Sequence, residues 1–229
     1  MLDEAMPVSV KPKRRPARHQ TDQPKPYHHG DLRRALIEAA LQLAGEGGAD
    51  AVSVREAARR AGVSPGAPFR HFPSRDALMT AVATELQRHF RAEIDAALAE
   101  VPDSDPLARF RALGLAYLRW AVRNPSRFEI ISSGRYFEHD KATELSRDNA
   151  ELIGLAELAL ADAFARGQLR SPDLKRVQVA SRALVYGFAR MNIDGHFPRW
   201  GIAEQEAGPT AEAILDLFID GIANRPKPV

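Results

Sequence analysis

The sequence predicts an all-α protein of about nine helices, with a small N-terminal helix-turn-helix domain and a larger helical domain after it. Apolar residues recur three and four positions apart, and no stretch alternates with the period of two that a strand requires. Capping residues followed by proline mark several helix starts, and glycines mark several ends. The expected helices cover residues 31–46, 53–60, 64–71, 74–100, 105–123, 125–133, 140–166, 172–194 and 209–224.

The composition excludes several kinds of site. The 229 residues include no cysteine, which excludes disulfides, thiolate nucleophiles and cysteine-ligated metals. No apolar run approaches the roughly 20 residues that span a bilayer. The N-terminus also has no apolar core of the kind that a signal peptide needs. We therefore expect a soluble, cytoplasmic protein.

Basic residues gather in the first third of the chain. The net charge is only +2, but residues 10–75 carry 13 Lys and Arg against 6 Asp and Glu. The rest of the chain carries 19 basic residues against 24 acidic ones. Such a split favours a polyanionic partner for the basic part, although a solvated basic tail would give the same counts.

Residues 1–26 precede the first expected helix and contain five prolines without hydrophobic periodicity. We expect them to form a flexible basic arm. The helix that follows places Leu32, Leu36 and Leu43 on one face, as an amphipathic helix does.

Residues 53–72 predict the helix-turn-helix. Ser53 and Glu56 match a capping box, in which the hydroxyl accepts the backbone N–H of Glu56 and the carboxylate reaches back. Gly62 provides the unhindered backbone that a tight turn between helices needs. Ser64 would then cap a helix whose N-terminus could face the major groove of DNA.

The side chains around this unit suit a nucleic acid. Arginines on the second helix, and at the boundary of the third and fourth, could hold phosphates, which fix register while base contacts specify sequence. Residues 64–67 have little hydrogen-bonding capacity, so we expect readout through thymine methyl groups, backbone groups and DNA shape. The predicted DNA-contact residues are Ser53, Arg55, Ser64, Pro65, Gly66, Ala67, Phe69, Arg70, His71 and Arg75.

The runs at 27–33 and 53–78 resemble the N-terminal domain of the tetracycline-repressor (TetR) family. The resemblance implies a homodimer of all-α subunits. Residues 27–75 would form the DNA-binding domain, and residues 76–229 the domain for effector binding and dimerisation. It also implies that Ser53 touches phosphate, and that an effector respaces the two recognition helices and usually releases the DNA.

Two residues depart from that family's pattern in the helix that should read the groove. Phe69 stands where tyrosine is usual, which removes a hydroxyl contact to phosphate. Pro68 stands where leucine is usual, and its missing N–H predicts a short or distorted third helix. Residues 182–197 resemble, more loosely, a C-terminal domain named for a Trp-His-Gly signature, with Tyr186 and Gly187 where His-Gly is usual.

Apolar stripes on the last two expected helices could build a four-helix interface with a second copy of the chain. Both stripes could instead face their own core. The predicted interface residues are Leu174, Val177, Leu184, Phe188, Met191, Ile214, Phe218 and Ile222.

Aromatic residues in the middle of the chain predict an apolar effector pocket, although such residues are more often plain core. The predicted pocket residues are Phe110, Tyr117, Trp120, Phe128, Tyr136, Phe137 and Phe188.

These features together predict a ligand-responsive transcriptional regulator, a repressor that a small molecule releases from a pseudo-palindromic operator. Its expected partners are double-stranded DNA, an unidentified effector and a second copy, with no membrane. One alternative is a small-molecule-binding adaptor with a vestigial helix-turn-helix, which Pro68 and Phe69 motivate; another is a helical dimer that acts only through protein contacts. No catalytic or nucleotide-binding motif is present, so we expect no enzyme, no cofactor and no metal site.

Overall fold

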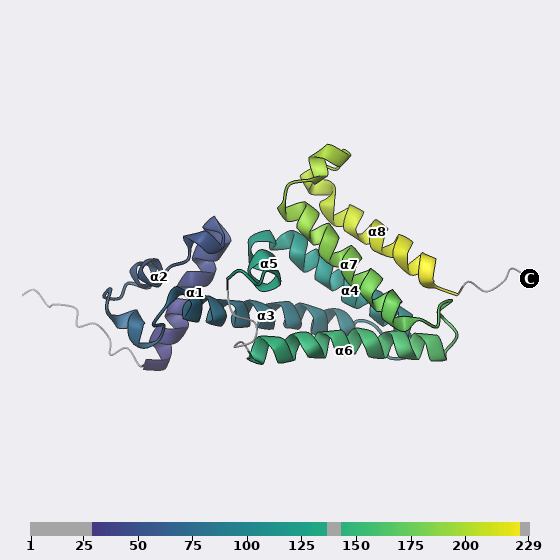
Figure 1. The fold of residues 1–229 in the computed structure, drawn as a ribbon, viewed down its shortest axis with the longest axis horizontal. Coiled ribbons are helices and arrows are strands. Elements are labelled where there is room, and N and C mark those ends of the chain that lie inside the picture. The colour runs from purple at the N-terminus through teal and green to yellow at the C-terminus, as the bar shows by residue number, and fades with distance from the viewer. Residues whose placement is uncertain (1–28, 137–142, 225–229) are drawn as a thin grey trace, which may run out of the picture.

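The computed structural model describes residues 29–136 and 143–224, in which eight α-helices form two packed units (Figure 1). The predicted all-α class is confirmed, because the described residues form no strand beyond one isolated bridge between Leu169 and Ala223. None of the described helices has the length and apolar character of a membrane span. The predicted basic arm lies outside the described residues.

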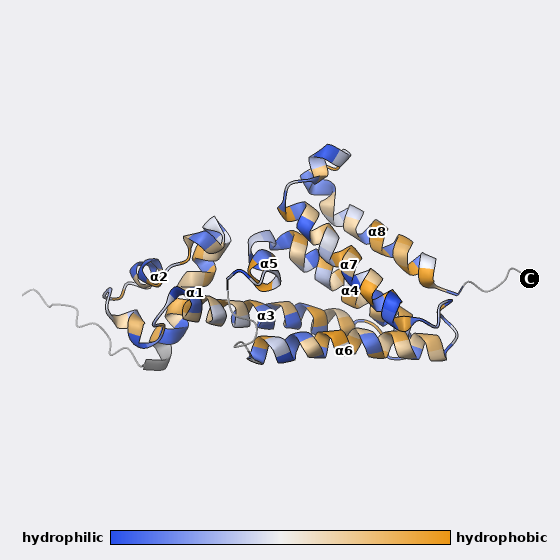
Figure 2. Cartoon of the chain, viewed as in Figure 1, coloured by the Kyte–Doolittle hydropathy of each residue, from blue (hydrophilic) through white to orange (hydrophobic). Residues whose placement is uncertain are grey.

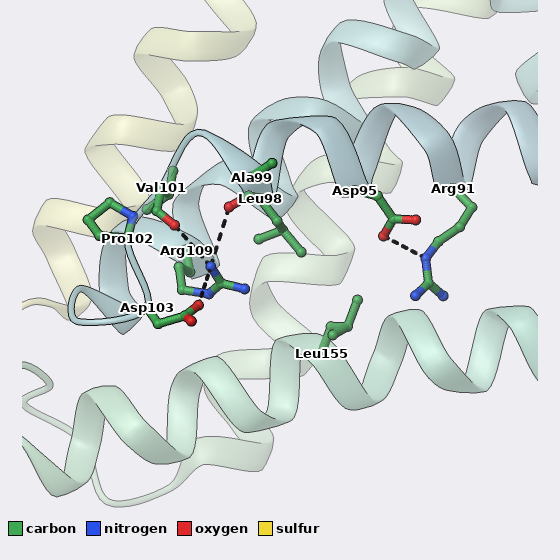
Figure 3. Close-up of a pocket in the computed structure, with 9 residues that line it drawn as sticks. All are labelled: Arg91, Asp95, Leu98, Ala99, Val101, Pro102, Asp103, Arg109 and Leu155. Atoms are coloured by element: carbon green, nitrogen blue, oxygen red, sulfur yellow. Dashed lines mark hydrogen bonds and ion pairs between the residues drawn. The ribbon is translucent and has the colours of Figure 1, made fainter.

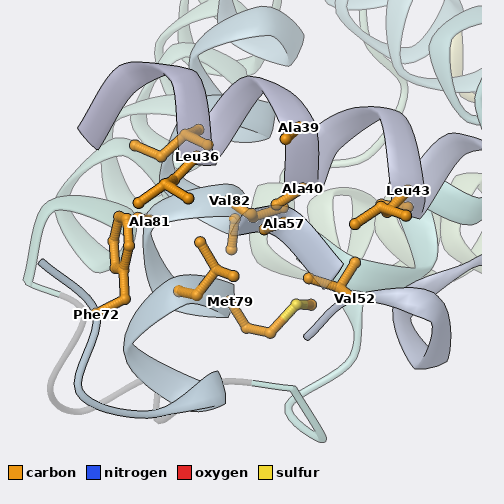
Figure 4. Packing of buried hydrophobic residues seen from close by; sticks show 14 of the residues in the cluster. Leu36, Ala39, Ala40, Leu43, Val52, Ala57, Phe72, Met79, Ala81 and Val82 are labelled. Carbon is orange, nitrogen blue, oxygen red and sulfur yellow. The ribbon is translucent and has the colours of Figure 1, made fainter. Parts of the chain in front are cut away.

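The first unit consists of α1 (His29–Gly47), α2 (Val54–Arg60) and the first half of α3 (Arg75–Ala99). Leucines of α1, alanines of α2 and apolar residues of α3 bury one another in a common core (Figure 4). Ala57 and Ala58 are completely or almost completely buried, and their small side chains let α2 approach its neighbours closely. The glycine turn expected after α2 is present, since Gly62 has a φ of 69°.

The segment between α2 and α3 differs from the expected α-helix at 64–71. It is a 3-10 helix, η2 (Ala67–Arg70), so this one element of the prediction is wrong. In an α-helix that began after Ser64, Pro68 would lack the N–H that bonds to the Ser64 carbonyl, and its ring would clash there. The chain instead makes the tighter bond from the Ala67 N–H to the Ser64 carbonyl, at 3.1 Å.

Helix α3 belongs to both units. Its residues up to Leu86 pack in the first core, and those from Phe90 onward pack in a second core. The core that α1 and α2 build therefore continues into the first half of α3. One continuous helix joins the two units, with no linker between them (Figure 1).

The second unit surrounds one central helix. Helix α4 contacts the other helices of this unit as well as α3. The helices of this unit are α4 (Pro106–Arg123), α5 (Pro125–Ser132), α6 (Thr143–Ala165), α7 (Leu174–Ile193) and α8 (Ala207–Ile222). Figure 2 shows apolar residues along the whole of α8.

Local side-chain caps fix several helix starts. The Ser53, Ser74 and Asp105 side chains each accept a backbone N–H three residues later, at 3.1 Å. The second half of the predicted capping box is wrong, because the Glu56 carboxylate turns away from Ser53 and pairs with Arg59. The α2 start is therefore held by the serine hydroxyl alone.

Candidate nucleic-acid interface

Most of the predicted DNA-contact residues lie on the surface of the first unit. Ser53, Ala67, His71 and Arg75 are half-buried. The exposed members of the set are Arg55, Ser64, Pro65, Gly66, Phe69 and Arg70. The surface of η2 and the residues just before it is therefore open to a partner.

Pro68 anchors this surface to the core. Its side chain is almost completely buried, whereas its neighbour Phe69 is 44% exposed and Arg70 is exposed. Nothing lies within 4 Å of the position that a Cβ would take on Gly66. The buried proline thus fixes a short segment that presents an aromatic ring, a guanidinium and an unobstructed glycine backbone.

Two arginines near this surface are free to bind an anion. Arg55 and Arg70 have no hydrogen-bond or ion-pair partner among the described residues. The Ser53 hydroxyl accepts a backbone N–H and keeps its own proton for donation. Cationic groups and a free hydroxyl donor are the chemistry that phosphate oxygens recognise.

The other arginines of the unit are engaged within the protein. Arg60 donates two hydrogen bonds to Glu46, at 2.6 and 2.8 Å, which joins α2 to the end of α1. The hydrogen bond from Arg60 lowers the pKa of the Glu46 carboxyl. Arg59 pairs with Glu56 in the same way, along its own helix.

Arg75, which we expected at a phosphate, has a structural role here. Its Nε donates to the carbonyl of Val52 at 2.9 Å, and its Nη2 donates to the carbonyl of Ala49 at 2.7 Å. These carbonyls belong to the first residue of η1 (Ala49–Ala51), the 3-10 turn between α1 and α2, and to the residue that follows it. No pattern in the sequence predicts these bonds, because their partners lie 23 and 26 residues away.

The predicted pocket residues are divided among three packed clusters, and Phe137 lies outside the described residues. Phe110 is buried in a third cluster with Leu160 and Val177, and Tyr136 packs against the first core. Four members share the second core: Tyr117, Trp120, Phe128 and Phe188. The effector pocket that these aromatic residues were expected to line stays a prediction.

The aromatic rings of the second core pack around Tyr117. Its ring centroid lies 5.5 Å from that of Phe90 and 5.4 Å from that of Phe128, both edge-on. Tyr186 of α7 lies 6.3 Å from Phe128 at the solvent edge of this cluster. Sequence reasoning missed the part that Phe90 plays, although Phe90 falls one turn after the buried Leu86 of the same helix.

Two surface hollows lie elsewhere in the second unit. A hollow of about 570 Å³ lies where α3, the start of α4 and α6 meet (Figure 3). In this hollow, Arg109 donates a hydrogen bond to the carbonyl of Val101 at 3.0 Å and forms an ion pair with Asp103 at 2.8 Å. A groove of about 820 Å³ lies between α3 and α4 beside Gly208, and alanines are the most frequent residues in its lining. Neither hollow is lined by the predicted aromatic residues.

The predicted dimer-interface residues are mostly core residues of their own chain. Val177 and Phe188 are buried, so they are not available to a partner. Leu174, Leu184, Met191, Ile214, Phe218 and Ile222 are partly buried and pack against the same cores. The exposed large apolar residues of α7 and α8 are Val179, Tyr186 and Leu217, of which Leu217 is 74% exposed.

Comparisons with known proteins match both units. A family model for bacterial regulatory proteins of the tetR family matches residues 36–82. A second model, for a tetracyclin repressor-like C-terminal domain, matches residues 110–218. The second match includes residues 182–197, where the sequence resembles a Trp-His-Gly domain, and that finer assignment stays a prediction.

Two curated relatives show how far the similarity extends. The transcriptional regulator BetI of Yersinia pestis is 36% identical over 190 residues, which are 83% of this chain and 78% of that protein. The transcriptional repressor KstR of Rhodococcus jostii is 33% identical over 108 residues. The match spans about half of KstR, since it covers 49% of that protein and 47% of this chain.

Solved structures share the fold. A protein of unknown function from Rhodococcus sp. RHA1 superposes with a TM-score of 0.71 and 29% identity, over 88% of this chain and 100% of that one. The regulator PfmR of Thermus thermophilus superposes with a TM-score of 0.62 and 21% identity, over 83% of this chain and 96% of that one.

Proposed function

The chain belongs to the tetracycline-repressor family of bacterial regulatory proteins, and from that premise we propose that it is a homodimeric repressor that a small molecule releases from a pseudo-palindromic operator. Membership makes it a DNA-binding, ligand-responsive transcriptional regulator. The repressor name of KstR supports repression over activation.

The observation that carries the proposal is the surface of η2 and α2. Arg55 and Arg70 are exposed without partners among the described residues, and Phe69 projects beside Arg70. The arginines suit phosphates, and the ring suits the methyl group of thymine in the major groove. This surface also argues against the adaptor alternative, because a vestigial unit would have no reason to keep free cations beside its reading segment.

The apolar surface of α7 and α8 supports the homodimer. Val179 and Tyr186 on α7, with Leu217 on α8, leave apolar area exposed on two adjacent helices. Two copies that share this surface would bury it in a four-helix interface and relate their two η2 segments by a two-fold axis. The operator would then repeat its half-sites with the same symmetry.

Helix α5 connects the second core, where we propose that the effector binds, to the DNA-binding unit. It contacts α1 and η1 of the first unit, and α4 and α7 of the second. Phe128 packs on Tyr117, while the next residue toward the helix start, Arg127, brings its Nη2 to 4.0 Å from the Cβ position on Gly45 of α1. An effector that displaces Phe128 would therefore move a helix that the first unit rests on.

Selection of random duplexes with the purified full chain tests the function. We expect enrichment of one pseudo-palindrome whose half-sites contain thymines. Enrichment of a single unrepeated site would contradict the dimer. Failure to enrich any duplex, together with retention of a small molecule, would support the adaptor instead.

A further inference from the structure

Tyr117 presents a buried hydroxyl with no partner among the described residues. Its side chain is buried among Phe90, Trp120 and Phe128, and its hydroxyl oxygen makes no hydrogen bond to any of these or other described residues. Burial raises the pKa of this hydroxyl, so it keeps its proton and acts as a donor. A buried donor without an acceptor destabilises the protein, and a ligand that supplies the acceptor would recover that loss.

Ser132, at the end of α5, carries a second buried hydroxyl without a partner among the described residues. The Oγ of Ser132 is also buried without a hydrogen bond to a described residue. Ser132 follows Phe128 by four residues in α5, so both lie on the same face of that helix. Because the Phe128 ring packs edge-on against Tyr117, Ser132 lies on the face of α5 that packs toward the Tyr117 cluster.

Arg182 adds a cation to this cluster. Its guanidinium lies over the Tyr117 ring, 4.9 Å from the ring centroid. Arg182 has no ion pair with any described carboxylate, and its side chain is exposed beside Tyr186 at the solvent edge of the cluster. Most other arginines of this unit are paired, as Arg111 is with Asp216 and Arg123 with Glu93.

We propose that the effector is a small carboxylic acid with an apolar body, whose carboxylate binds Arg182 and the Tyr117 hydroxyl while its body lies among the aromatic rings. Ser132 is the second donor to the same ligand. This inference rests on the proposed function, which requires an effector, and it names the chemical class. A carboxylate accepts from both hydroxyls and offsets the charge of Arg182, whereas an ammonium group would meet like charge.

The chain provides its own optical probe for this site. It contains only two tryptophans, Trp120 and Trp200. Trp120 lies in the cluster, 5.1 Å from Phe90, whereas Trp200 is 72% exposed outside it. In the full-length Trp200→Phe variant, the emission therefore reports on Trp120 alone. The titrants are phenylacetate and hexanoate, each with its amide and with the amine of similar size.

We expect saturable changes in Trp120 emission with at least one acid, and none at the same concentrations with its amide or amine. Tyr117→Phe and Arg182→Gln should each weaken that acid about tenfold or more, as loss of a hydrogen bond to a charged group does. Arg176→Gln is the matched control, because Arg176 lies on α7 but pairs with Asp173, and it should leave the affinity unchanged.

Three outcomes would overturn the inference: neither acid binds, an amide or amine binds as tightly, or Tyr117→Phe and Arg182→Gln bind the acid as well as the parent. Thermal unfolding separates binding from folding, since Tyr117→Phe removes an unpaired hydroxyl and should not lower Tm. No DNA is present in this titration. Failure of the acids to bind thus leaves DNA binding untouched, and an acid that binds without releasing DNA would contradict the proposed regulation alone.

Discussion

At the scale of single residues, the arginines of the helix-turn-helix have two roles: some stabilise the fold, and others are available to bind DNA. Arg60 and Arg75 donate to groups of their own chain and hold the turns together. Arg55 and Arg70 carry the same charge but have no partner among the described residues. Residue type alone does not separate these roles, because a guanidinium suits a backbone carbonyl, a carboxylate and a phosphate alike.

Arg75→Ala should destabilise the protein by about 1–3 kcal/mol, because it leaves the carbonyls of Val52 and Ala49 without their charged donor. Denaturant unfolding measures this change. Arg70→Ala is the matched control and should change stability by no more than about 0.5 kcal/mol, since its side chain is exposed and has no partner among the described residues. Equal stability of the two variants would refute the structural role of Arg75.

At the scale of elements, the positions of two prolines explain why η2 is a 3-10 helix and not an α-helix. Pro65 sits where the first residue of an α-helix would be, a position that tolerates proline, whereas Pro68 falls three residues later and blocks the α-helical bond. The segment therefore takes the 3-10 form and exposes Phe69 and Arg70.

Pro68→Ala should restore a longer helix. It supplies the missing N–H, so the amides of residues 69–72 should exchange with solvent more slowly than their counterparts in the parent chain. Hydrogen exchange with mass spectrometry measures this. Pro65→Ala is the control, because the N–H it adds has no helical acceptor, and the two variants should differ. Unchanged exchange in Pro68→Ala would mean that something other than the proline sets the 3-10 form.

Helices α4 and α8 are joined by ion pairs that predict a dependence on pH. The hydrogen bonds from Arg111 lower the pKa of Glu212 and of Asp216 below their ordinary values of 4.5 and 3.8. A carboxyl with a lowered pKa stabilises the fold fully above its ordinary pKa, and that stabilisation is lost as the pH falls through the lowered value.

Arg111→Gln should therefore be less stable than the parent at pH 7, and the difference should shrink as the pH falls from about 5 toward about 3. Because both carboxylates are partly exposed, the difference is expected to be small. Denaturant midpoints at a series of pH values measure it. A difference that stays constant over this range would show that the pairs contribute nothing.

The elements differ in how well the sequence predicts them, and the reason is the range of the interactions. The start of α3 is predictable because Ser74 bonds to Ala77, only three residues away. The distortion at Pro68 is predictable because proline acts on its own backbone. The role of Arg75 and the burial of Phe188 are not, because both depend on residues that only the fold brings near.

At the scale of the whole molecule, the sequence also does not determine which way the apolar stripes of α7 and α8 face. Helical spacing identifies a stripe, but it does not say whether the stripe faces the core or a partner. Val177 has the spacing that predicts an interface residue, but it is buried in the core of its own chain. Val179, two residues later on another face of α7, is 58% exposed.

Leu217→Glu should convert the proposed homodimer to monomers, because it places a charge on the exposed apolar surface of α8. Sedimentation velocity measures the change. Leu158→Glu is the matched control, since Leu158 is 64% exposed on α6, which is not one of the two proposed interface helices, and it should leave the dimer intact. Dissociation by Leu158→Glu alone would place the interface on α6.

The salt dependence of DNA binding tests the central claim, that the helix-turn-helix binds DNA through its free arginines. Fluorescence anisotropy with the selected duplex between about 50 and 200 mM salt gives the slope of log K against log salt. We predict a steep negative slope, which Arg55→Ala and Arg70→Ala each make shallower by about one per DNA-bound subunit. An affinity that does not change with salt, or a slope that neither variant alters, would contradict the account.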